Sequence, residues 1–172
     1  MASIEQYFAG MDKAPMFGSG QYFSADFKGV VKTRSMKVNN GFKGLCFIAE
    51  FEVVESNTDK DPVGSTRSYV VKMGPENRNA FADIKALVFA VALQTDPKKA
   101  GAPEQNPALH AQAAEIVKAA CEPEYAKKIG VPPDALEGLP VRLETWGKPT
   151  RPSAKNPQGG VFTVHSWYPA AG

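Results

Sequence analysis

The chain has 172 residues, of which 43% are hydrophobic and 22% charged, and its formal net charge is +2. This composition is typical of a soluble globular protein and argues against a wholly disordered chain. No run approaches about 20 consecutive apolar residues, which excludes a transmembrane helix, and residues 1–10 lack the basic and apolar regions of a secretory signal.

Residues 1–20 are expected to form an irregular N-terminal leader. Glycine and proline interrupt this stretch between isolated apolar residues such as Phe8 and Phe17. Regular patterns begin at residue 21. Residues 21–172 are interpreted as one domain, since the chain is near the usual size of a single domain. The leader is expected to lie over this domain or to fold on a partner.

The first strand is predicted over residues 21–37. Apolar and polar residues alternate there, and a period of two indicates a strand with one buried face. Lys28, Lys32 and Arg34 share the other parity and are therefore expected on the solvated face. Gly29, inside the run, indicates a bulge or a bend of the kind that a closing barrel needs.

Two more strands complete a predicted meander. Asn39-Asn40-Gly41 is a hairpin-turn signal, because Asn and Gly tolerate positive φ angles. Residues 45–53 alternate again. After a loop rich in Asp, Asn, Pro and Gly, residues 65–73 do the same, so the first half of the chain is expected to form three antiparallel strands.

The second half mixes helices and strands. Residues 80–93 carry apolar side chains at spacings of three and four, which predicts an amphipathic helix. Residues 95–138 contain prolines and an alanine-rich stretch and are interpreted as a helical insertion. Alternation returns in residues 140–148 and 161–168, which are predicted to be the last two strands, joined by a loop over residues 149–160.

The predicted element order is that of an OB-fold, a five-stranded, partly open Greek-key barrel. The chain is therefore expected to be mainly β, with a helix between the third and fourth strands and the helical insertion after that helix. An OB-fold binds its ligand on the face of its second and third strands and through the loops after the first and fourth strands. Those loops correspond here to residues 36–43 and 149–160.

Basic residues gather in the same regions. Residues 28–43 carry five basic and no acidic side chains, and residues 139–172 carry four basic and one acidic. Binding of single-stranded nucleic acid requires a cationic groove and aromatic side chains on which bases stack. The candidate nucleic-acid-binding residues are Lys28, Lys32, Arg34, Lys37, Phe42, Lys43, Arg67, Tyr69, Lys72, Trp146, Lys148, Arg151, Lys155 and Trp167.

Few residues are available for catalysis or metal binding. The chain has two histidines and two cysteines, and it contains no nucleotide-binding or nucleophile-elbow motif. We therefore predict a binding protein that is not an enzyme, with no cofactor, no metal and no catalytic residue. His165 is interpreted as a residue that packs in the barrel. A small nuclease that holds magnesium through Asp26 and Glu50 or Glu52 is a weaker alternative.

Three segments carry a family resemblance: the opening strand Y-F-S-A-D-F-K-G-V-V-K-T, the strand F-I-A-E-F-E-V-V-E-S with the following P-V-G-S, and the helix A-F-A-D-I-K-A-L-V. Across residues 21–93 and 139–168 the chain resembles the OB-fold single-stranded DNA-binding proteins of tailed bacteriophages. The resemblance implies a replication or recombination accessory that coats single strands without catalysis. Many such proteins recruit partners through an acidic tail, whereas no acid follows Glu144 here.

The expected partner is single-stranded DNA, with replication or recombination proteins as further candidates and no membrane contact. The insertion at residues 95–138 is a candidate surface for self-association. The expected location is the cytoplasm, that of a bacterial host if the protein is viral. The alternative function is that of a phage structural or adaptor protein, whose barrel docks proteins and whose apolar leader is the contact.

Overall fold

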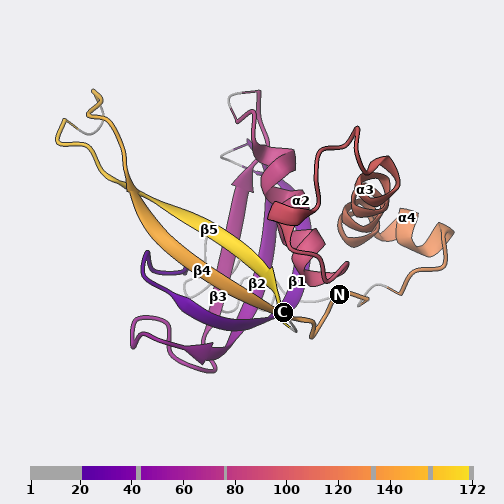
Figure 1. The fold of residues 1–172 in the computed structure, drawn as a ribbon, viewed down its shortest axis with the longest axis horizontal. Coiled ribbons are helices and arrows are strands. Elements are labelled where there is room, and N and C mark those ends of the chain that lie inside the picture. Colours follow the sequence, from indigo (N-terminus) through magenta and orange to yellow (C-terminus); the bar gives the residue numbers. More distant parts are fainter. Residues whose placement is uncertain (1–20, 42–43, 76, 133–134, 155–156, 171–172) are drawn as a thin grey trace, which may run out of the picture.

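The computed structural model describes residues 21–41, 44–75, 77–132, 135–154 and 157–170. Within this part the fold is mainly β, with helices between the third and fourth strands (Figure 1). The strands are β1 (Lys28–Gly41), β2 (Gly44–Ser56), β3 (Thr66–Lys72), β4 (Pro140–Pro149) and β5 (Val161–Pro169). The helices are α2 (Ala80–Val91), the 3-10 helix η1 (Pro97–Lys99), α3 (Pro107–Cys121) and α4 (Pro123–Lys128). No helix in the described ranges has both the length and the apolar character needed to span a bilayer.

The strands form one open antiparallel sheet in the order β3-β2-β1-β4-β5. The central strand β1 pairs with β2 as far as Gly41, but with β4 only over Lys28–Lys32. Two register shifts interrupt the β1–β2 ladder, between Val30 and Val31 and between Thr33 and Ser35. Such irregularities bend a strand and increase its twist, so the sheet curves around its buried face.

Gly29 lies just before the first of these shifts. A Cβ atom at this position would lie 1.9 Å from the backbone carbonyl oxygen of Glu55, on the paired strand. Real Cβ atoms do not approach a backbone oxygen so closely, so this crossing of two strands requires glycine. The predicted irregularity near Gly29 is thus confirmed, and the two register shifts lie after this residue.

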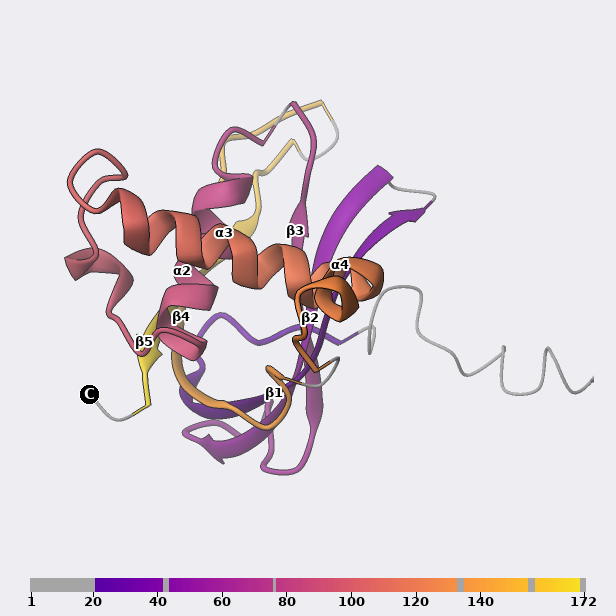
Figure 2. The same ribbon diagram turned by 90° about the vertical axis from the view of Figure 1, so that its right-hand side faces the viewer.

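The buried face of the sheet packs against α2. The largest fully buried side chains of the strands include Phe27, Phe47, Phe51 and Leu143. Helix α2 contributes its apolar stripe to the same core, and α3 then packs on the far side of α2 (Figures 1 and 2). Burial of each such side chain contributes roughly 1.5–3 kcal/mol, so this core is the main source of stability.

Aromatic side chains span the opening between the two edge strands, β3 and β5. The ring centroid of Tyr69 lies 4.6 Å from that of His165 and 5.1 Å from that of Trp167. Phe23 adds a ring 6.2 Å from His165. Side-chain packing therefore holds these two edges together in the described structure, where no ladder joins them.

The predicted elements agree with the structure except at two boundaries. The first strand was expected over residues 21–37 but begins at Lys28. Phe23 and Phe27 are both buried, with ring centroids 5.0 Å apart across a turn. The backbone N–H of Phe27 donates to the side-chain Oγ1 of Thr145 on β4 at 2.9 Å, and the Phe27 carbonyl oxygen accepts from Thr145 N–H at 2.9 Å. A turn that buries alternate residues thus imitates the pattern of a strand.

The second difference concerns the first hairpin. The turn was expected at Asn39-Asn40-Gly41 and the loop over residues 36–43, but β1 continues to Gly41, which pairs with Gly44. The segment contains two glycines, and Gly44 takes the positive φ of 91°. Residues 36–41 are therefore strand residues. Asn39 and Asn40 pair with Cys46 and Leu45, so they belong to the ladder and not to the turn.

Candidate nucleic-acid interface

The basic side chains of β1 lie on the outward face of the sheet. Lys28, Lys32, Arg34 and Lys37 are all exposed. Lys37 shares parity with core residues in the sequence, and the register shift between Thr33 and Ser35 returns it to the outward face. All four predicted cations of this strand are therefore accessible to a phosphate backbone.

Arg34 forms an ion pair on this face. Its Nη1 atom lies 2.9 Å from Glu52 Oε2, and both side chains are roughly half exposed. Solvent and salt screen such a pair, which contributes only about 0–1 kcal/mol. Arg34 can therefore exchange this carboxylate for a phosphate at little cost.

The outward face of β2 and β3 is acidic rather than basic. Glu50 and Glu52 are partly exposed there, and their cross-strand partners are Ser68 and Thr66. Ser68 is buried. Lys72 is exposed at the end of β3. This face, where the sequence predicted ligand binding, therefore offers a polyanion less positive charge than the outward face of β1.

Arg67 is an interior residue, which corrects its prediction as a phosphate contact. Its Nε atom lies 2.7 Å from Asp61 Oδ1, and the two side chains are only 8% and 1% exposed. Its guanidinium also donates to Gln21 Oε1 at 2.8 Å and to the Lys60 carbonyl oxygen at 2.9 Å. Asp61 in turn accepts a hydrogen bond from the backbone N–H of Ser24 at 3.0 Å. Arg67 thus anchors the segment before β1 to the loop before β3.

Tyr69 and Trp167 are also interior residues, which corrects their prediction as stacking platforms. They are 8% and 3% exposed and pack together in the opening between β3 and β5. Burial raises the pKa of the Tyr69 hydroxyl. The Trp167 ring stacks on Phe51, with centroids 5.1 Å apart. A base could reach either ring only if the core opened, so neither belongs to a preformed binding surface.

The last two strands form an arm that extends away from the body of the sheet (Figure 1). The pairing of β4 with β1 ends at Glu144, and beyond this residue β4 pairs with β5 alone. Side chains on the arm are correspondingly open to solvent. Trp146 is 47% exposed and Phe162 is 62% exposed.

Trp146, Lys148, Phe162 and Val164 share one side of this arm, which we call the arm face. In the β4–β5 register Trp146 lies opposite Val164, and Lys148 lies opposite Phe162. Directly opposed residues project to the same face, and diagonal neighbours lie about 7–8 Å apart. The arm face therefore places a lysine beside two exposed aromatic rings.

The arm face continues into the basic outward face of β1. Lys28 lies opposite Glu144, and Val30 lies opposite Arg142, so these residues share the side that carries Trp146. The Arg142 guanidinium also lies 5.5 Å from the centroid of the Tyr168 ring. Cations and aromatic rings from β1, β4 and β5 thus lie on one outward surface, with Glu144 among them.

Phe162 was absent from the predicted interface. The alternation of β5 contained the necessary signal, because Phe162, Val164 and Tyr168 have the parity opposite to the buried Trp167. Arg151 is exposed in the loop between β4 and β5. Three predicted residues, Phe42, Lys43 and Lys155, lie outside the described residues.

His165 lies among aromatic rings, in line with its interpretation as a packing residue. Its ring centroid lies 4.6 Å from Tyr69, 6.0 Å from Trp167 and 6.2 Å from Phe23. Burial lowers the pKa of His165 from 6.5 to about 4, so the imidazole is neutral near pH 7. A neutral imidazole in contact with three rings contributes to the side-chain packing between β3 and β5.

Two of the acidic residues considered for a magnesium site form ion pairs with basic side chains. Asp26 pairs with Lys60 at 3.1 Å and Glu52 pairs with Arg34 at 2.9 Å. The hydrogen bond from Lys60 is the main cause that lowers the pKa of Asp26. In the described ranges no three His, Cys, Asp or Glu side chains gather in a group able to hold a metal ion.

Comparisons of the chain with protein-family models, with curated proteins and with solved structures find no match. The geometry of the arm face and of β1 is therefore the basis for inferring a function.

Proposed function

We propose that this chain binds single-stranded DNA with little sequence preference and coats exposed single strands during phage replication or recombination. The binding surface is the arm face together with the basic outward face of β1. The proposed role needs no catalysis, cofactor or metal. Replication or recombination proteins, the candidate partners, would meet the protein in the cytoplasm of a bacterial host.

The proposal includes an OB-fold barrel. Several features support it: β1 lies between β2 and β4, α2 follows β3, and side chains span the opening between β3 and β5. A five-stranded, partly open barrel with this element order is the arrangement of an OB-fold. The proposed contact surface is shifted from the β2–β3 face, which is acidic here, toward β1, β4 and β5.

The observation that carries the proposal is the exposure of Trp146 and Phe162 beside Lys148. Core packing does not account for these aromatic side chains, because they are exposed on a two-stranded arm. Stacking of a base on such a ring contributes roughly 1–3 kcal/mol and tolerates any sequence, because every base has a π face. Lys28, Lys32 and Lys148 would supply the attraction to phosphates, which also makes binding salt-dependent.

A protein-docking adaptor is the second candidate, because exposed aromatic side chains also mark protein contacts. In that case Trp146 and Phe162 would fill pockets of a protein partner. Binding to that partner would survive high salt, whereas binding to a polyanion would weaken steeply as salt rises.

The test is fluorescence anisotropy of a labelled oligo(dT) of about 30 nucleotides, titrated at two salt concentrations with duplex DNA as competitor. OB-folds that bind single strands cover about 4–16 nucleotides each, so this length suffices. We expect salt-sensitive binding that duplex DNA does not displace, and a marked loss of affinity in Trp146→Ala/Phe162→Ala. The matched control is Tyr125→Ala on α4, at the opposite end of the molecule from the arm (Figure 1). Absence of binding at low salt, or an equal loss in both variants, would contradict the proposal.

A further inference from the structure

The residues just before β1 lie against the base of the arm (Figure 1). We call residues 21–27 the strap. Phe23 and Phe27 of the strap are buried and belong to the core cluster of the sheet. The strap is therefore part of the packed body, whereas the arm extends beyond that body.

Thr145 joins the strap to β4, one residue beyond the point where β1 stops pairing with β4. Its Oγ1 atom accepts a hydrogen bond from Phe27 N–H at 2.9 Å and donates one to the Ser24 carbonyl oxygen at 2.6 Å. Its backbone N–H donates to the Phe27 carbonyl oxygen at 2.9 Å. Thr145 is buried, so water competes little for these bonds.

A second contact with the strap lies two residues farther along the arm. Gly147 faces the same side of β4 as Thr145, opposite to Trp146. A Cβ atom at Gly147 would lie 3.6 Å from the Cβ atom of Ala25, which is ordinary van der Waals contact. The strap therefore supports the inner side of the arm and leaves the arm face open.

The loop between β2 and β3 bonds to the strap in turn. Asp61 accepts hydrogen bonds from the N–H of Ser24, at 3.0 Å, and from its hydroxyl, and it pairs with the buried Arg67. Asn57 Nδ2 donates to the Asp26 carbonyl oxygen at 3.0 Å. A continuous series of polar contacts thus leads from the buried ion pair through the strap to the arm.

We propose that Thr145 is a positioning residue for DNA binding, because its bonds to the strap fix the orientation of the arm relative to β1. The inference rests on the proposed function. In the fixed orientation, Trp146 and Phe162 lie on the same outward surface as the lysines of β1, so one single strand can contact both regions.

The arm needs such support because it has only two strands. Beyond Glu144, β4 pairs with β5 alone, and an isolated pair of strands is marginally stable at best. Apparent affinity falls in proportion to the fraction of molecules in the binding-competent conformation. Loss of the strap contacts should therefore weaken DNA binding, although Thr145 itself faces away from the DNA.

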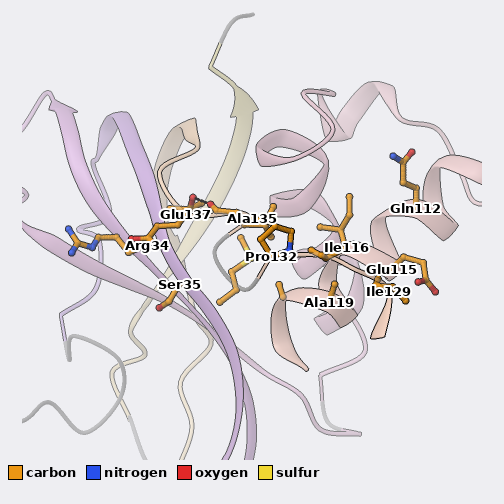
Figure 3. Close-up of a pocket in the computed structure, with 15 residues that line it drawn as sticks. Arg34, Ser35, Gln112, Glu115, Ile116, Ala119, Ile129, Pro132, Ala135 and Glu137 are labelled. Carbon is orange, nitrogen blue, oxygen red and sulfur yellow. Dashed lines mark hydrogen bonds between the residues drawn. The ribbon is translucent and has the colours of Figure 1, made fainter. Parts of the chain in front are cut away.

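Thr33 on β1 provides a matched control for Thr145. Both threonines are buried. Thr33 Oγ1 also bonds to the backbone of a neighbouring segment, accepting from Leu139 N–H at 3.1 Å and donating to the Leu136 carbonyl oxygen. Thr33 lines an apolar pocket of about 380 Å³ between β1 and α3 (Figure 3), away from the arm. Thr33→Val should therefore lower stability much as Thr145→Val does, without affecting the strap.

The test measures oligo(dT) affinity and the backbone ¹⁵N relaxation dispersion of residues 146–148 and 161–164. Thr145→Val removes the hydroxyl but keeps the shape of the side chain, and we expect it to bind about three- to tenfold more weakly. This loss corresponds to an arm that is correctly oriented for about a third to a tenth of the time. Microsecond-to-millisecond exchange of the arm amides should increase in the same variant. Thr145→Ser keeps the hydroxyl and should retain the wild-type values, as should Thr33→Val.

Wild-type affinity or unchanged arm relaxation in a folded Thr145→Val would overturn the proposal. So would an equal loss of affinity in Thr145→Ser or in Thr33→Val. If Thr145→Val does not fold, Asn57→Ala removes an exposed side chain that bonds to the strap. It should change both quantities in the same direction, and wild-type values in Asn57→Ala would then overturn the proposal.

Failure of the wild type to bind oligo(dT) would instead contradict the proposed function. The relaxation of the arm amides in Thr145→Val would still decide whether Thr145 fixes the orientation of the arm.

Discussion

The β2–β3 region and the β4–β5 arm use the same kinds of residue in opposite ways. In β2 and β3 the aromatic side chains Phe47, Phe51 and Tyr69 point inward and are buried, and glutamates occupy the outward face. On the arm, Trp146 and Phe162 point outward beside a lysine. An aromatic residue in a strand is therefore buried where another element covers its face of the sheet, and it is available to a binding partner where none does.

The same contrast applies to charge. Arg67 carries its charge in the interior, where Asp61 neutralises it, whereas Lys28, Lys32 and Lys148 are exposed. Substitution of the interior residues should therefore lower stability, whereas substitution of the exposed residues should lower binding.

The two tryptophans should respond in opposite ways to replacement by alanine. Trp167→Ala removes a 3% exposed side chain from the core and should cost about 3–5 kcal/mol of unfolding free energy. Trp146→Ala should change stability by less than about 0.5 kcal/mol and weaken oligo(dT) binding by about 1–3 kcal/mol. Urea unfolding and anisotropy measure the two quantities. A large stability loss in Trp146→Ala would show that the arm packs against the body.

Arg67→Ala should be as destabilising as loss of a core side chain. It leaves Asp61, which is 1% exposed, as an uncompensated charge, at an expected cost of about 3–5 kcal/mol. Arg34→Ala breaks an exposed pair and should cost about 0–1 kcal/mol. Denaturant midpoints of the two variants test this difference. Equal midpoints would place Arg67 at the surface.

Stability should fall in mild acid because of His165. Burial lowers its pKa from 6.5 to about 4, so the unfolded chain binds this proton first as the pH falls. The contribution is complete above about pH 6.5 and is lost as the pH falls toward 4, by an amount of about 3 kcal/mol. Urea unfolding at several pH values should show a shallower acid loss in His165→Phe than in the wild type. Identical slopes would mean that the imidazole accepts a proton in the folded state.

Single lysine variants should give the smallest effects. Each phosphate contact contributes about 0.7 to the slope of log affinity against log salt for a single strand. Lys148→Ala should lower the slope by about that amount, whereas Lys127→Ala on α4 serves as the control and should leave it unchanged. Equal slopes in the wild type and in Lys148→Ala would exclude a phosphate contact at this lysine.

Alternation predicted most of the sheet, because a strand with one covered face repeats every two residues. It also contained the burial of Arg67, which shares parity with Tyr69 and Val71. Its ionic partner could not be predicted, because Asp61 lies in a loop. A buried cation is tolerated only where the fold brings a carboxylate within reach.

The arm and the pocket were beyond what the sequence could predict. Whether Trp146 and Phe162 face solvent depends on where β1 stops covering β4, which is a property of register rather than of composition. The pocket joins β1 to α3, two elements far apart in the sequence, through a contact that periodicity does not encode.

Tryptophan fluorescence during titration with oligo(dT) tests most directly whether the arm face binds DNA, since the chain has one exposed and one buried tryptophan. We expect quenching in the wild type as bases stack on Trp146. We also expect retained binding without that quenching in Trp146→Phe, because phenylalanine keeps a stacking surface. Quenching that persists in Trp146→Phe, or binding that leaves Trp146 fluorescence unchanged, would contradict the assignment of the arm face as the DNA-binding surface.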